Sequence, residues 1–110
     1  MLLLPQDAII PQAKLTQYLL VPLPKDDKSK FLAQAGYTLD NWQQLEHDLR
    51  IQILIHPAEF IETTRYGDKY MIRSCLRGLN NIELNVLTVW IVSNQVNQFV
   101  TLVPDKGANS

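Results

Sequence analysis

Cationic, hydroxyl and aromatic side chains recur at even spacing in the C-terminal half of the chain. Lys69 and Arg73 lie four residues apart, Thr88 and Trp90 lie two residues apart, and Thr101 follows further along. Lysine and arginine bind phosphate, hydroxyl groups form hydrogen bonds, and an indole ring can stack on a base. A surface that carried all of these side chains would suit single-stranded nucleic acid.

These residues fall within a predicted β-sheet. The segment Leu84–Val92 is dominated by β-branched and aromatic residues and is bounded by polar segments, as is typical of a central strand. Residues 60–64, 69–76 and 99–103 predict three further strands. The connections between the predicted strands are short, which implies antiparallel neighbours.

Alternation along each strand divides the predicted sheet into two faces. We expect one face to pack against helices and to carry aliphatic and aromatic side chains, namely Tyr70, Ile72, Leu76, Leu87, Val89, Ile91, Val100 and Leu102. The opposite face, the predicted second face, would carry Lys69, Met71, Arg73, Val86, Thr88, Trp90, Val92, Phe99, Thr101 and Val103. Alternation does not say which face of each strand meets the core. A tryptophan on a central strand is also typical of a core, and a helix or a partner could cover this face.

The N-terminal half predicts helices. Leu15, Tyr18 and Leu19 have the spacing of a short helix that begins near Pro11 and ends before Pro22. A second helix would run from Lys28 to about Ala35, after an N-cap at Asp26 or Asp27 and before Gly36.

A third helix is predicted from Thr38 or Asp40 to about Ile55, because Pro57 disfavours helical geometry at the residue before it. Its buried stripe would be Trp42, Leu45 and Leu49. The predicted fold class is therefore α+β, with N-terminal helices packed on one face of a four-stranded antiparallel β-meander.

Composition limits the classes of function. The 110 residues fit a single domain (1–110), with an apolar leader at 1–9 and a flexible tail at 105–110. The net charge of −1 excludes a globally basic surface, so nucleic acid would need a local patch. The apolar runs are too short for a membrane span, and we expect no membrane partner. A single cysteine cannot form an internal disulfide, and we expect a cytoplasmic protein whose first residues are retained.

Residues suited to acid–base, nucleophilic or metal chemistry are few and scattered. His47 and His56 lie in no motif with a nucleophile or a metal-ligand spacing, so we expect surface histidines. Cys75 falls inside a predicted strand and is expected to be a small core residue. The sequence contains no zinc spacing, P-loop or glycine-rich dinucleotide turn. We therefore expect no metal and no cofactor, and the sequence names no catalytic residue.

Several short motifs resemble a known pattern in both order and spacing. They are Ile10-Pro11, Lys14-Leu15, Tyr18-Leu19-Leu20, Lys28-x-Lys30-Phe31-Leu32, Gly36-Tyr37, Trp42 with Leu45, Thr64-x-Tyr66-Gly67-x-Lys69-Tyr70, Thr88-Val89-Trp90-Ile91 and Val100-Thr101. This pattern is similar to that of a small bacterial domain of unknown function that is common in cyanobacteria. The polar positions that match it are Lys28, Lys69, Thr88, Trp90 and Thr101.

At the level of the fold, that family resembles the barnase, colicin-ribonuclease and RelE class of RNA-cleaving toxins. The resemblance implies a toxin-like protein, but a shared fold does not establish a shared activity. The sequence also departs from the family pattern. Residues 79–85 replace a glycine-rich basic hairpin, and Leu102 replaces an aromatic residue.

Two hypotheses follow. In the first, the chain is a toxin-like RNA-interacting or RNA-cleaving protein. Its expected substrate-binding residues contact phosphate, form hydrogen bonds or stack, and they are Lys28, Arg65, Lys69, Arg73, Thr88, Trp90 and Thr101. In the second, the chain is a non-enzymatic interaction domain that binds a cognate small protein or a second copy of itself as a homodimer. Binding of RNA should weaken steeply as salt rises, whereas an aromatic interface should not.

Overall fold

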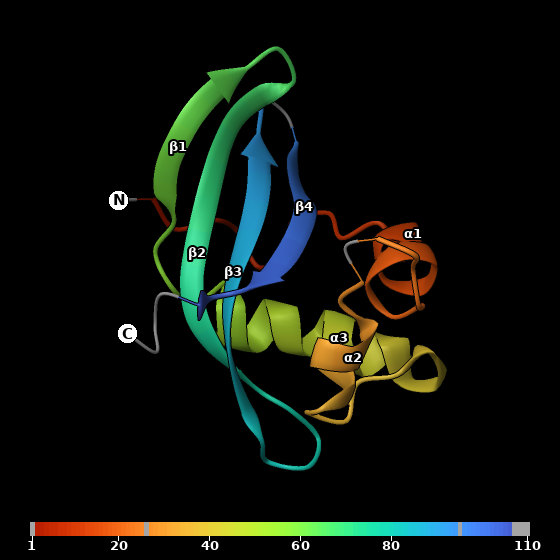
Figure 1. The fold of residues 1–110 in the computed structure, drawn as a ribbon. Helices are drawn as coiled ribbons and strands as arrows, with labels where there is room; N and C mark the ends of the chain where they lie inside the picture. Colours follow the sequence, from red (N-terminus) through yellow and green to blue (C-terminus); the bar gives the residue numbers. More distant parts are fainter. Residues whose placement is uncertain (1, 26, 95, 107–110) are drawn as a thin grey trace.

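The computed structural model describes residues 2–25, 27–94 and 96–106. Within these residues, four strands form one antiparallel sheet in the order β1-β2-β3-β4 (Figure 1). The strands are β1 (Glu59–Thr64), β2 (Gly67–Arg77), β3 (Glu83–Val92) and β4 (Asn97–Pro104). The helices precede the sheet in the chain. The predicted α+β class and the antiparallel meander are therefore confirmed.

The helices are short, and several run directly into one another. Helix α1 (Gln12–Lys14) continues as the π-helical segment η1 (Leu15–Leu19), and α2 (Ser29–Ala33) stands alone. The 3-10 segment η2 (Leu39–Asn41), helix α3 (Trp42–Asp48) and the π-helical segment η3 (Leu49–Ile53) are continuous. Figure 1 shows α1 beside β4 and α3 across the lower end of the sheet.

Capping side chains place the helix ends close to where the sequence predicts them. Asp27 accepts a hydrogen bond from the backbone N–H of Ser29 at 2.9 Å, and Asp26 lies outside the described residues. Thr38 and Asn41 form a reciprocal capping box at the start of the third helix. Gly36 follows α2 with a φ of +91°, a conformation that favours glycine.

The helices cover the face of the sheet that carries Trp90. Leu84, Val86, Thr88 and Trp90 of β3 are buried, and so are Ile72 and Leu76 of β2. Leu45, Leu49 and Ile53 of the third helix belong to the same core and are fully buried. The prediction that Leu87, Val89 and Ile91 face the helices is therefore wrong, although the predicted alternation is right.

The size of Trp90 explains why this face is the buried one. Its ring meets Phe99 edge to face at a centroid distance of 5.2 Å, and large aromatic rings contribute most to a core when they are buried. The indole N–H donates to the hydroxyl oxygen of Thr88 at 2.9 Å. Because the two polar groups pair with each other, burying both costs little.

A β-bulge changes the face pattern along β4. Val89 pairs with Thr101 and Trp90 pairs with Phe99, so Val100 is the extra residue. The bulge turns Phe99 into the core while Thr101 stays on the opposite face. Leu102 is buried as predicted. Phe99 lies beside Trp90, as the predicted second face has it, but that face is the buried one, and Thr101 does not share it.

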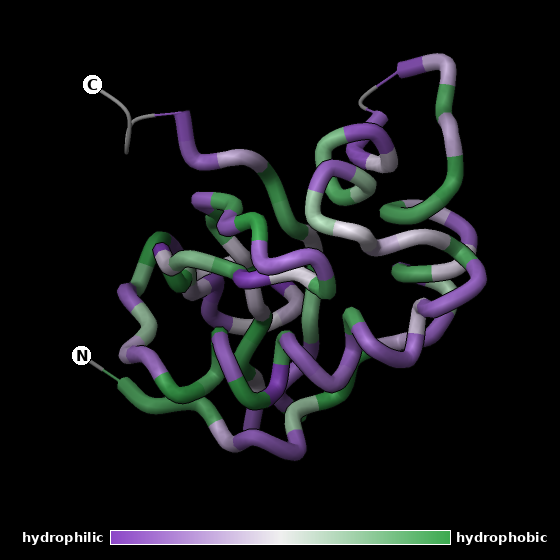
Figure 2. Tube along the Cα trace, turned by 90° about the horizontal axis from the view of Figure 1, so that it is seen from below, coloured by the Kyte–Doolittle hydropathy of each residue, from purple (hydrophilic) through white to green (hydrophobic). Residues whose placement is uncertain are grey.

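The apolar leader, predicted at residues 1–9 and described from residue 2, connects the two edges of the sheet. Leu2 forms a bridge with Ala58 just before β1, and Ile9 forms a parallel bridge with Gln98 of β4. Figure 2 shows the hydrophobic residues at the start of this segment, and Leu4 is buried in the core. At the other end of the chain, the predicted tail begins with Asp105, which is also buried; residues 107–110 lie outside the described residues.

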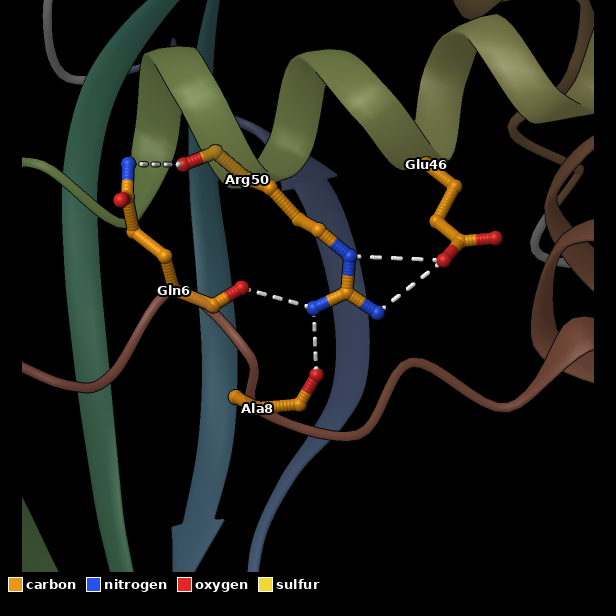
Figure 3. Close-up of polar contacts among 4 residues, drawn as sticks. All are labelled: Gln6, Ala8, Glu46 and Arg50. Carbon is orange, nitrogen blue, oxygen red and sulfur yellow. Dashed lines mark hydrogen bonds and ion pairs between the residues drawn. The ribbon is translucent and has the colours of Figure 1, made fainter.

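Arg50 connects this N-terminal segment to the third helix through hydrogen bonds (Figure 3). Its guanidinium donates to the backbone oxygens of Gln6 and Ala8 at 2.8 and 2.6 Å and forms an ion pair with Glu46 at 3.0 Å. Gln6 returns a side-chain hydrogen bond to the backbone oxygen of Arg50. One side chain therefore provides a donor for two backbone carbonyl groups of the segment.

Candidate functional site

The face of the sheet opposite Trp90 remains accessible, and we call it the open face. It is defined by side chains that alternate with the buried ones, namely Lys69, Met71, Arg73, Leu87, Val89, Ile91 and Thr101. All of these residues are exposed or partly exposed. The open face thus holds Lys69, Arg73 and Thr101 of the predicted site. Thr88 and Trp90, also predicted there, lie on the other side of the sheet with none of their surface exposed.

A groove of about 670 Å³ occupies one end of the open face, and we call it the open-face groove. It lies where the β1–β2 and β3–β4 connections meet, beside α1. Its lining residues are Lys14, Thr64, Tyr66, Lys69, Ile91, Ser93, Val96, Gln98, Phe99 and Val100. The groove therefore combines two ammonium groups with the exposed ring of Tyr66 and an apolar floor that includes Phe99.

Tyr66 is the most accessible aromatic ring at the groove. Its side chain lies in the β1–β2 turn and is 72% exposed. The guanidinium of Arg65, a predicted site residue, lies 5.3 Å from the centroid of the ring. Such a cation–π contact orients a ring without covering it on both sides. Tyr66 therefore offers the stacking surface that the sequence predicts for Trp90.

The two predicted cations of β2 both have carboxylate partners. Lys69 lies 3.2 Å from Glu62, and the two side chains are 33% and 58% exposed. Arg73 donates to both carboxylate oxygens of Asp105 at 3.0 and 3.1 Å, and the Asp105 side chain is only 3% exposed. An exposed pair contributes little to stability, so Lys69 can exchange Glu62 for another anion. Arg73 is more firmly held, because its partner is buried.

A second group of polar side chains lies at the edge of the sheet, where η1 passes β4. The ammonium of Lys28 donates to the hydroxyl of Tyr18 at 2.7 Å, and that hydroxyl lies 3.1 Å from the hydroxyl of Thr101. The ammonium groups of Lys28 and Lys14 lie 5.0 and 5.9 Å from the centroid of the Tyr18 ring. We call Lys14, Tyr18, Lys28 and Thr101 the Tyr18 cluster.

The Tyr18 cluster is rich in positive charge. Among the residues that the structure describes, no carboxylate oxygen lies within 4 Å of the ammonium of Lys14 or Lys28. The two ammonium groups are instead held near one aromatic ring. Two like charges repel each other at such a site, so a bound anion would stabilise it.

Sequence reasoning finds part of this arrangement and misses the rest. Lys28 and Thr101 are predicted, but Tyr18 enters the prediction only through its helical spacing from Leu15 and Leu19 and through the family resemblance. Both leucines are fully buried, whereas Tyr18 is half-buried with its hydroxyl toward Thr101. The signal that could have found the cluster is Lys14, which lies four residues before Tyr18 and therefore on the same side of a helix.

Other residues with reactive groups lie outside the groove and the cluster. His47 and His56 are exposed, as predicted. Cys75 is exposed as well, so its predicted place in the core is wrong: its position on β2 puts it on the open face with Arg73. Partial burial of the thiol and the carboxylate of Glu83 raise the pKa of Cys75, which keeps it protonated. Within the described ranges, no three His, Cys, Asp or Glu side chains are grouped to hold a metal ion.

Comparison with known proteins places the chain in a family. A family model described as "Domain of unknown function (DUF6883)" matches residues 4–106. The match agrees with the resemblance to an uncharacterised domain. Searches of curated proteins and of solved structures gave no match. In the described part of the chain, no helix is long and apolar enough to cross a membrane.

Proposed function

This chain belongs to the DUF6883 family, and we propose that it binds single-stranded RNA in the open-face groove. One observation carries the proposal: Lys14, Tyr66 and Lys69 come from separate segments of the chain and line the same groove. Cations that contact phosphate, next to an exposed ring that stacks on a base, are the usual elements of a single-strand site.

The roles of individual residues differ from those that the sequence predicts. Tyr66 replaces Trp90 as the stacking ring, because Trp90 is fully buried. Arg65 would keep the Tyr66 ring oriented, and Lys69 would exchange Glu62 for a phosphate. Arg73 is 55% exposed at its side chain and has guanidinium N–H groups besides those that bind Asp105, so it can extend the site along β2.

RNA cleavage, the finer form of the first hypothesis, comes from the resemblance to ribonuclease toxins. Among the described residues that line the groove, none is a histidine, aspartate or glutamate. We therefore propose binding and assign no catalytic residue.

The test is RNA binding measured by fluorescence anisotropy with a short labelled uridine-rich oligonucleotide. The K14Q/K69Q double variant should bind more weakly, because it neutralises fewer phosphates. Its plot of log K against log salt should be shallower by about 0.7 for each phosphate that is no longer neutralised. Tyr66→Ala should weaken binding roughly tenfold, since stacking on one base is worth about 1–3 kcal/mol.

The matched control removes the same amount of charge elsewhere. Lys25 and Lys30 are exposed and do not line the groove, so the K25Q/K30Q double variant should keep the affinity of the wild type to within about twofold. Absence of RNA binding at low salt would overturn the proposal. Equal loss of affinity in the two double variants would overturn the location of the site.

A protein-interaction role is the second candidate, and the surface around β1 favours it. This edge strand and the nearby N-terminal segment expose apolar side chains, with Leu3 at 65%, Phe60 at 55% and Ile61 at 42%. An exposed apolar edge strand can pair with another chain. If the chain self-associates there, its mass measured by light scattering should rise with concentration, and Ile61→Lys should abolish that rise. A monomer at all concentrations would exclude self-association.

A further inference from the structure

The Tyr18 cluster adjoins the open-face groove. Lys14 belongs to both, since it lines the groove and lies over the Tyr18 ring. Thr101 directly follows Val100, which is another groove-lining residue. A strand of RNA in the groove would therefore bring one of its phosphates close to the cluster.

Tyr18 holds the two lysines of the cluster in place. Its hydroxyl accepts a hydrogen bond from Lys28, and its ring attracts both ammonium groups. A lysine ammonium has three donors, so Lys28 keeps N–H groups for a further acceptor. Tyr18 is thus a positioning residue, and the two lysines are the groups that would contact an anion.

The charge of the cluster selects one type of phosphate. A phosphodiester within a strand carries one negative charge. A terminal phosphate monoester has a second pKa of about 6, so it carries almost two negative charges at neutral pH. Lys14 and Lys28 supply two positive charges without a carboxylate within 4 Å among the described residues. Two ammonium groups match a dianion better than they match a single charge.

We propose that the Tyr18 cluster binds the terminal phosphate monoester of an RNA strand that occupies the open-face groove. This inference rests on the proposed function and deepens it: the ligand is a phosphorylated end, not only a stretch of single strand. The cluster would set the direction in which the strand lies, because only one end can reach it.

The experiment compares three labelled RNA oligonucleotides of one sequence, which carry a 5′-phosphate, a 3′-phosphate or neither. One phosphorylated oligonucleotide should bind the wild-type protein about tenfold tighter than the unphosphorylated one at neutral pH, as expected for charge-assisted hydrogen bonds. This advantage should shrink as the pH falls below about 6, where the phosphate loses its second charge.

Variants separate the cluster from the groove. Lys28→Gln should remove the advantage of the phosphorylated end and leave binding of the unphosphorylated oligonucleotide within about twofold of wild type, because Lys28 does not line the groove. Tyr18→Phe keeps the ring but removes the hydroxyl that holds Lys28, so it should reduce the advantage in part. Lys30→Gln, a change two residues later in α2, should keep it in full.

Different failures have different meanings. If no oligonucleotide binds, the proposed function fails. If all three bind the wild type equally, or if Lys28→Gln weakens all three to the same degree, the terminal-phosphate inference fails while groove binding stands. A competition arm with inorganic phosphate tests the source of the anion: binding of free phosphate as tightly as the phosphorylated strand would overturn the assignment to a strand end.

Discussion

Thr88 and Trp90 show how single residues decide which face of a strand is buried. The hydroxyl of Thr88 accepts the indole N–H of Trp90 at 2.9 Å and lies 3.4 Å from the backbone oxygen of Ile72. Neither side chain has any exposed surface. Polar groups that pair within the core allow a strand to bury a large ring next to a hydroxyl.

This pairing predicts the effect of Thr88→Val. Valine has nearly the same shape but cannot accept the indole N–H, so a buried donor would lose its partner at a cost of about 1–3 kcal/mol. The free energy of unfolding in urea should fall by that amount. Thr63→Val changes an exposed residue in the same way and should cost less than about 0.5 kcal/mol. Equal costs for the two variants would contradict the assigned hydrogen bond.

The thiol of Cys75 gives a prediction about pH. Partial burial and the nearby carboxylate of Glu83 raise its pKa above the ordinary value, and only the thiolate is a nucleophile. Alkylation by iodoacetamide at mildly alkaline pH should therefore be slower in the folded protein than in the same protein unfolded in urea. The rate should rise only at higher pH.

Glu83→Gln tests the cause of that pKa shift. Removing the carboxylate should lower the pKa of Cys75 and move the pH profile of alkylation to lower pH. An unchanged profile would show that Glu83 does not act on the thiol.

At the scale of elements, the N-terminal segment depends on one arginine. Arg50 binds the backbone oxygens of Gln6 and Ala8, and the adjacent Ile9 pairs with β4 through its amide, which donates to Asn97 at 2.7 Å. Loss of the guanidinium would leave both carbonyl groups without that donor. The N-terminal segment should then separate from the sheet more often.

Arg50→Gln should therefore lower the free energy of unfolding by about 1.5–3 kcal/mol, as expected for hydrogen bonds to a charged group. Amide hydrogen exchange at Ile9 should become faster. Arg77→Gln is the control, because it removes an exposed ion pair with Glu83 and should cost less than about 0.5 kcal/mol. If the rate of amide hydrogen exchange at Ile9 is unchanged in the Arg50 variant, Arg50 does not hold the N-terminal segment against the sheet.

The elements themselves could be predicted because their signals are local. Periodicity, prolines, glycines and caps place three helical regions and four strands near their observed positions. The burial of each face could not be predicted, because alternation defines two sets of side chains without saying which set meets the helices. The bulge at Val100 depends on the register with β3, which is a tertiary feature.

The candidate site could be predicted in part for the same reason. Lys69 and Arg73 share one face because they alternate along a single strand, whereas Thr101 joins them only through the register of β4 with β3. Tyr66 and Lys14 reach the groove because the β1–β2 turn and α1 approach the same end of the sheet. Contacts between segments so far apart in the sequence leave no local pattern.

At the scale of the whole molecule, lysines gather at one place although the net charge is −1. Lys14 and Lys69 line the open-face groove, where Lys69 also pairs with Glu62, and Lys28 lies at the neighbouring edge of the sheet. A local positive patch on a nearly neutral protein can bind a phosphate strand without a globally basic surface. We therefore propose that RNA binds the open face and not the face that holds Trp90.

Isoleucine methyl groups provide the most direct measurement of that place. Ile91 lines the groove, Ile72 lies fully buried on the other face, and exposed isoleucines elsewhere report on the remaining surface, namely Ile9, Ile51, Ile55, Ile61 and Ile82. In methyl NMR spectra of a protein labelled at isoleucine, titration with the RNA oligonucleotide should shift the Ile91 signal most and leave that of Ile72 nearly unchanged. If the Ile91 signal does not shift and the largest shift occurs at one of the other exposed isoleucines, RNA does not bind the open face.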